Sequence, residues 1–105
     1  MRRILIPVID KEFELVPQFE KLEEEVKEVW EGIMSLYDGA NIEEDGKLHE
    51  ELASEVLDVI QVCVGLAEII ERQCKGSLEK AAEKHPAKLI NYGFKFKKIL
   101  RVDED

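Results

Sequence analysis

Apolar residues recur at steps of three and four along residues 19–37, which is the spacing of one face of an α-helix. The set consists of Phe19, Leu22, Val26, Val29, Trp30, Ile33 and Tyr37. We therefore predict a first helix that begins between Lys11 and Pro17, ends at Tyr37 and buries this stripe. Asp38-Gly39 follows directly and is typical of a turn.

A second helix is predicted from about Leu48 to Lys75, after a polar loop over residues 39–47. Gly76 has the position of a residue that ends a helix in the left-handed conformation. Residues 56–70 contain few strongly polar side chains, namely Asp58, Gln61 and Glu68. A helix that is apolar nearly all round lies at the centre of a fold or is covered by a second subunit.

The remaining segments complete an all-α pattern. Ser77 is placed to cap a third helix, and Pro86 either kinks that helix or opens a fourth one carrying residues 88–100. We expect residues 101–105 to fray. Short connections and the lack of a convincing strand pattern predict one domain over residues 1–105, an all-α helical bundle.

The N-terminal segment differs from the rest. Residues 4–9 read ILIPVI, but Pro7 excludes a central β-strand. We interpret residues 1–10 as an extended arm that covers a partner subunit. The apolar run is too short for a signal peptide, and no segment reaches the length of a membrane span.

Charge and cysteine content narrow the possible partners. The net charge of −9 argues against nucleic acid or an anionic membrane as the main partner. Residues 84–102 nevertheless contain six Lys or Arg and no acid, which is either a phosphate-binding face or a solvated basic face. Cys63 and Cys74 lie roughly 16 Å apart on one helix, too far for a disulfide, so we expect a reducing cytoplasm.

Two pairs of acidic residues carry the candidate chemistry. Glu25 and Glu28 are i,i+3 neighbours beside the predicted buried stripe, although a run of glutamates is usually a solvated face. Glu55 and Asp58 are more informative, because the same angular sector is continued by apolar residues, Val62 and Ile69. Burial of such charges costs several kcal/mol unless a cation or hydrogen bonds compensate. The alternative is an ion pair with one of three lysines, Lys21, Lys27 or Lys88.

Four carboxylates without His or Cys favour a hard cation, Mg²⁺ or Mn²⁺ as a substitute. Mg²⁺ commonly shares its coordination sphere with substrate phosphates, which indicates phosphoryl or pyrophosphoryl chemistry. The sequence contains no P-loop and no dinucleotide-binding glycine motif.

The two acidic motifs resemble those of a known family. LxEExxEV at Leu22–Val29, followed by ELASEVLDVI at Glu51–Ile60, is similar to the all-α nucleoside triphosphate pyrophosphohydrolases of the MazG-like group. This superfamily includes dimeric dUTP pyrophosphatases and phosphoribosyl-ATP pyrophosphohydrolases, and the resemblance covers roughly residues 15–100. It implies a MazG-like bundle, hydrolysis of a nucleoside triphosphate to monophosphate and pyrophosphate, and assembly into homodimers or homotetramers.

The resemblance also implies roles for single residues. The Mg²⁺ ligands fall on Glu25, Glu28, Glu55 and Asp58. Glu24 would orient or deprotonate the attacking water next to Glu25. The stretch at residues 85–93 resembles HxxKLxxRG apart from its Arg position, which implies phosphate binding by Lys88, with Asn91 and, one or two turns later, Lys95 as further contacts. The alternative function is a non-catalytic helical module that binds metal or nucleotide.

Overall fold

Three helices follow one another along the chain in a computed structural model that describes residues 3–38 and 42–104, and their side chains apart from those of residues 42–45. They are α1 (Leu15–Tyr37), α2 (Ile42–Gln73) and α3 (Ser77–Asn91). The described residues contain no strand. The predicted all-α fold class is therefore confirmed.

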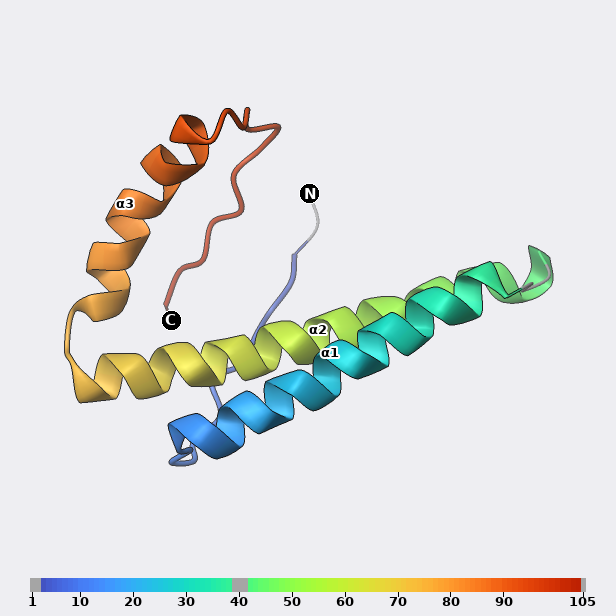
Figure 1. Cartoon of the computed structure of the whole chain (residues 1–105), viewed down its shortest axis with the longest axis horizontal. Coiled ribbons are helices and arrows are strands. Elements are labelled where there is room, and N and C mark those ends of the chain that lie inside the picture. The colour runs from blue at the N-terminus through green and yellow to red at the C-terminus, as the bar shows by residue number, and fades with distance from the viewer. Residues whose placement is uncertain (1–2, 39–41, 105) are drawn as a thin grey trace.

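Helices α1 and α2 form an antiparallel hairpin. They lie side by side along the long axis of the molecule, and α3 turns away from the hairpin at the end of α2 (Figure 1). With 32 residues, α2 is about 48 Å long at 1.5 Å per residue, nearly the full 49 Å extent of the chain. The hairpin is therefore the frame on which any site is built.

Close contact between α1 and α2 depends on glycine. The Gln18 side chain of α1 is buried, and its Nε2 donates a hydrogen bond of 3.2 Å to the carbonyl oxygen of Val62 in α2. A Cβ at Gly65 would collide with this amide group. At the other end of the hairpin, a Cβ at Gly32 would lie 3.0 Å from Leu52 Cδ1. The absence of side chains at both glycines lets the two helices approach each other.

The bounds of the first two helices follow the sequence pattern with one difference. α1 begins and ends within the predicted limits. α2 begins at Ile42 rather than at Leu48, so the predicted loop over residues 39–47 is too long; of that loop, residues 39–41 lie outside the described residues. Gly46 lies inside this helix, so its low helix propensity does not delay the start of α2.

Of the predictions for the third helix, the cap at Ser77 was wrong, and one of the two alternatives for Pro86 does not hold. Ser77 does not cap it, because its hydroxyl donates to the carbonyl oxygen of Cys74, and the residue before the helix is Gly76 with φ 87°. No fourth helix follows Pro86 in the described residues, since α3 continues through the proline and ends at Asn91.

A Schellman motif ends α3. Gly93 has φ 89°, its N–H donates to the Ile90 carbonyl at 2.9 Å, and the Phe94 N–H donates to the Leu89 carbonyl at 3.2 Å. A side chain at residue 93 would be strained in this conformation. Residues 94–104 contain no helix, so the basic residues beyond α3 lie on irregular chain rather than on a helical face.

The N-terminal arm lies against its own chain. Residues 3–14 contain neither helix nor strand. Gln61 Nε2 donates to the Pro7 carbonyl at 2.6 Å, and the Arg72 guanidinium donates to the Phe13 carbonyl at 2.9 Å. The arm is thus tied to α2 at two points and is longer than the predicted residues 1–10.

The apolar stripe of α1 is largely exposed. Among the described apolar residues only Val62 and Ile69, both on α2, are buried. Phe19, Val26, Trp30 and Tyr37 are all more than half exposed, whereas the other three residues of the stripe, Leu22, Val29 and Ile33, are half-buried. The predicted burial of this stripe is therefore incomplete within one chain. None of the described helices combines the length and apolar character needed to span a membrane.

The chain exposes more surface than a folded monomer of its mass. Its accessible surface is 9587 Å², whereas a monomeric protein of 12.1 kDa exposes roughly 6,000 Å². Its radius of gyration is 16.6 Å, compared with about 13 Å for a compact chain of this length. An open hairpin with an exposed apolar stripe accounts for both differences.

Candidate metal centre

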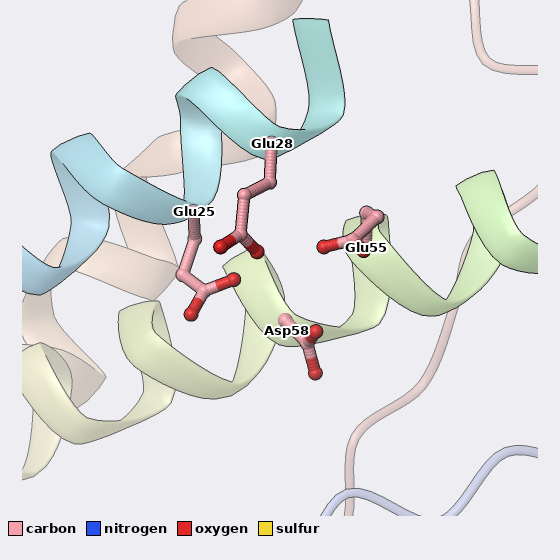
Figure 2. Close-up of side chains that lie close together, drawn as sticks. All are labelled: Glu25, Glu28, Glu55 and Asp58. Atoms are coloured by element: carbon pink, nitrogen blue, oxygen red, sulfur yellow. The ribbon is translucent and has the colours of Figure 1, made fainter. Parts of the chain in front are cut away.

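Two i,i+3 pairs of acids face each other across the hairpin. Figure 2 shows Glu25 and Glu28 reaching from α1 toward α2, where Glu55 and Asp58 lie. One carboxylate oxygen from each of the four residues lies within 4.8 Å of the others. We call these four residues the carboxylate cluster. Their spacing places each pair on one side of its helix, and the antiparallel packing brings the two sides together.

The inner part of the carboxylate cluster is shielded from solvent. Glu25 is 6% exposed and is the only buried carboxylate among the described residues, while Glu55 is half-buried. Glu25 Oε2 and Glu55 Oε2 are both buried without a hydrogen-bond partner. An unpartnered buried acceptor costs about 1–3 kcal/mol, and more if it is charged. A cation between the two helices would remove this cost.

The neighbouring carboxylates shift the ionisation of Glu28. Hydrogen bonding to Glu55 and then to Glu25, together with the negative charge of Glu25, raises the pKa of Glu28 to about 7. Without a cation, a proton therefore partly neutralises the site near neutral pH. A divalent ion would take over that role and release the proton.

One lysine reaches the cluster, but it does not balance its charge. Lys21 Nζ lies 3.0 Å from Glu25 Oε1 and 3.4 Å from Glu24 Oε2. Hydrogen bonding to Glu25 raises the pKa of Lys21. Lys27 and Lys88, the other two lysines considered as partners, form no ion pair with the cluster within the described part of the chain. One exposed ammonium cannot neutralise four carboxylates.

The donor set suits a hard divalent cation. Carboxylate oxygens are the ligands that Mg²⁺ and Mn²⁺ favour, and no Cys or His competes within the cluster. Glu28 and Asp58 lie on the exposed side of the site. This side leaves room for waters or phosphate oxygens, which Mg²⁺ sites in enzymes usually retain.

The other residues implied by the resemblance lie outside the cluster. Glu24 is exposed and pairs with Lys21. Lys88 and Asn91 are exposed on α3, and Lys95 is exposed on the segment that follows. The α3 ribbon turns away from the hairpin (Figure 1), and none of these three residues belongs to the carboxylate cluster or to the cavity beside it.

A cavity next to the cluster was not predicted from the sequence. It has a volume of about 330 Å³ and lies between the N-terminal arm and the hairpin, with Glu25 and Asp58 in its wall. Gln18 and Gln61 also line it. A signal was present, since Gln61 is one of the few polar residues in the apolar stretch of α2, but its hydrogen bond to the arm could not be inferred from spacing.

Comparison of the chain with protein-family models, with curated proteins and with solved structures finds no match. The observations that bear on function are therefore those of the carboxylate cluster and its surroundings.

Proposed function

We propose that the chain is a Mg²⁺-dependent nucleoside triphosphate pyrophosphohydrolase, with Mn²⁺ as a possible substitute for Mg²⁺. The observation that carries the proposal is the carboxylate cluster with its two buried, unpartnered oxygens. The order and spacing of the two acidic motifs, which resemble those of the MazG-like group, support the same reaction class.

In the proposed reaction a water oxygen forms a new P–O bond and the bridging α,β P–O bond of the triphosphate breaks. The products are a nucleoside monophosphate and pyrophosphate, and the water protons pass to solvent or to a carboxylate. Bound Mg²⁺ supplies charge neutralisation on the phosphates and makes water more acidic.

Each side chain of the site has a separate role in the proposed reaction. The carboxylate cluster holds the cation, with Glu25 and Glu55 fixed by burial and Glu28 and Asp58 at the open side. Glu24 is proposed to orient or deprotonate the water, because it is exposed next to Glu25 and is tied to it through Lys21. Lys21 meets the phosphates once the cation takes over Glu25.

Lys88, Asn91 and Lys95 remain proposed phosphate contacts. Their support is the acid-free basic segment over residues 84–102, which is suited to a polyanionic substrate. Contact with the cluster requires α3 to approach it from a second copy or after movement.

We propose further that the protein works as a homodimer or homotetramer. The excess exposed surface and the exposed stripe of α1 support this, because a second hairpin laid on the stripe would complete a four-helix bundle. Obligate interfaces bury about 2,000–5,000 Å² in total, or about 1,000–2,500 Å² per partner, so the excess exposed surface of each chain is large enough for such an interface.

Incubation of the protein with ribo- and deoxyribonucleoside triphosphates and Mg²⁺ tests the proposed reaction. We expect at least one substrate to yield monophosphate and pyrophosphate in equal amounts, and EDTA to stop the reaction. Orthophosphate as the product would contradict the proposal. Silence across the whole panel, with metal still bound, would favour the non-catalytic binding module.

A further inference from the structure

The cavity beside the carboxylate cluster has the form of a small-molecule site. Its volume of about 330 Å³ lies at the lower end of the ~300–1,000 Å³ range of ligand pockets. Its walls are mainly apolar, with Val62 and Ile69 of α2 on one side and Val8, Ile9 and Phe13 of the arm on the other. A ligand inside it would be held between the arm and the hairpin.

The arm that covers this cavity is fixed rather than loosely placed. Gln61 binds the carbonyl of Pro7, and Arg72 binds the carbonyl of Phe13. These two α2 residues are three helical turns apart, about 16 Å along the axis. The arm segment over residues 7–13 therefore spans the cavity between two hydrogen-bonded ends. Within this segment, the Lys11 ammonium lies over the Phe13 ring, with Nζ 5.4 Å from the ring centre.

The wall also carries amide groups in fixed positions. Gln18 uses its Nε2 to bind Val62, which leaves its Oε1 as an acceptor. Gln61 uses its Nε2 to bind Pro7 and likewise keeps an acceptor. Apolar walls with a few fixed polar groups are suited to a flat heterocycle. The walls pack on the two faces of the ring, and the amide oxygens accept hydrogen bonds from its edge.

The cavity is continuous with the carboxylate cluster, because Glu25 and Asp58 belong to both. A molecule in the cavity would place one end beside the cation site. Lys21 also lines the cavity and lies 3.0 Å from Glu25, at the junction of the two regions. The junction thus joins a mainly apolar compartment to a compartment for phosphate and metal.

From this arrangement we infer that the cavity under the N-terminal arm binds the nucleoside part of the substrate, with its phosphates directed past Lys21 to the carboxylate cluster. The inference rests on the proposed function for its choice of ligand. It assigns the arm over residues 7–13 to substrate binding, and it makes Gln61 a positioning residue that holds the arm in place.

Binding of nucleoside monophosphates in the presence of Mg²⁺, measured by calorimetry on the full chain, tests the inference without any turnover. The variants are Val8→Trp, which places a bulky group at the cavity, and Gln61→Met, which keeps the side-chain length but removes the donor to Pro7. The matched controls are Ile4→Trp, on the arm but not lining the cavity, and Gln73→Met, exposed at the end of α2. Melting curves confirm that each variant is folded.

We expect at least one monophosphate to bind, its Kd to rise at least about tenfold in Val8→Trp and Gln61→Met, and the controls to stay within about twofold of the wild type. Absence of binding for every monophosphate, or equal Kd values in the variants and their controls, would overturn the inference. The pyrophosphate assay reports separately on the proposed function. An active enzyme with unchanged KM in Val8→Trp would refute only the nucleoside site.

Discussion

Glu25 combines three properties that a purely structural carboxylate rarely has together. It is buried, one of its oxygens has no partner, and the other is paired with an exposed lysine. The lysine satisfies one oxygen and leaves the second directed at the hairpin interface. Its neighbours in the cluster add charge of the same sign. These properties favour a site completed by a cation over a closed ion-pair network.

Replacement of one acid of the cluster by its amide distinguishes a cation site from a closed ion-pair network. In Glu55→Gln or Asp58→Asn we expect turnover to fall by at least about 10²-fold, because a ligand is lost. We expect the metal-free melting temperature to stay the same or rise, because repulsion between carboxylates falls. Melting curves with and without Mg²⁺ provide the test, with Glu51→Gln, exposed on the same helix, as control. Strong destabilisation of the metal-free variant would show that these acids are structural partners.

The raised pKa of Glu28 predicts a pH dependence. In the metal-free protein Glu28 keeps its proton up to about pH 7, whereas in the unfolded chain it ionises near its ordinary value of 4.5. The folded state then binds more protons between these values, so the contribution of Glu28 to stability falls as pH rises from 4.5 to 7. Cation binding should reverse this loss.

Calorimetry of Mg²⁺ or Mn²⁺ binding at pH 6, 7 and 8 in buffers of different ionisation enthalpy checks the prediction. We expect affinity to increase with pH and binding at pH 6 to release about one proton, because the cation displaces it from the cluster. Glu28→Gln should abolish most of this release. Proton release that is the same at pH 6 and pH 8 would contradict the assignment.

At the scale of elements, helix spacing predicted the two long helices and the two acidic pairs that they carry. Two i,i+3 pairs on consecutive helices could be expected to meet once the helices pack antiparallel. The face that α1 turns toward α2 was predicted only in part, because its buried residues are the polar Gln18 and Glu25, whereas the apolar stripe is half-buried at some positions and exposed at the others. The end of α3 was also missed, although Gly93 carries the same signal as Gly76, a glycine that ends a helix in the left-handed conformation.

We expect opposite effects when alanine replaces two glycines of α2, Gly65 and Gly46. Gly65→Ala would push the Gln18 amide off the Val62 carbonyl and should destabilise the hairpin by about 1–3 kcal/mol. Gly46→Ala, at a helical position with open space around it, should stabilise the protein by about 0.5–1 kcal/mol. Denaturant unfolding at one fixed protein concentration measures both. A neutral Gly65→Ala would show that the helices do not approach as described.

At the scale of the whole molecule, the described residues form a candidate metal site but bury very few apolar side chains. Two buried apolar residues among those described do not stabilise a hairpin of this length, whereas the exposed stripe of α1 offers the missing apolar surface. The sequence indicated that one chain cannot cover all of its apolar surface, because the second helix is apolar nearly all round. In the proposed oligomer, the way in which copies associate would depend on which faces remain exposed, and that is a property of the packed hairpin rather than of either helix alone.

Trp30 provides the test of assembly. It is 59% exposed within the single chain and lies in the middle of the stripe, so we expect Trp30→Lys to dissociate the oligomer or to lower its stability sharply. Glu20→Lys, exposed on the same helix, is the control and should leave assembly intact. Sedimentation at micromolar concentration measures the result. A wild-type protein that sediments as a stable monomer would refute the proposed oligomer.

Crystals of the protein soaked in Mn²⁺ and measured for anomalous scattering test the central claim, a cation centre between the two helices, most directly. We expect an anomalous peak in contact with carboxylate oxygens of Glu25, Glu28, Glu55 and Asp58, with open positions toward the cavity, and no such peak in Asp58→Asn. A soaked wild-type crystal without a peak at the carboxylate cluster, or with its only peaks elsewhere on the surface, would contradict it.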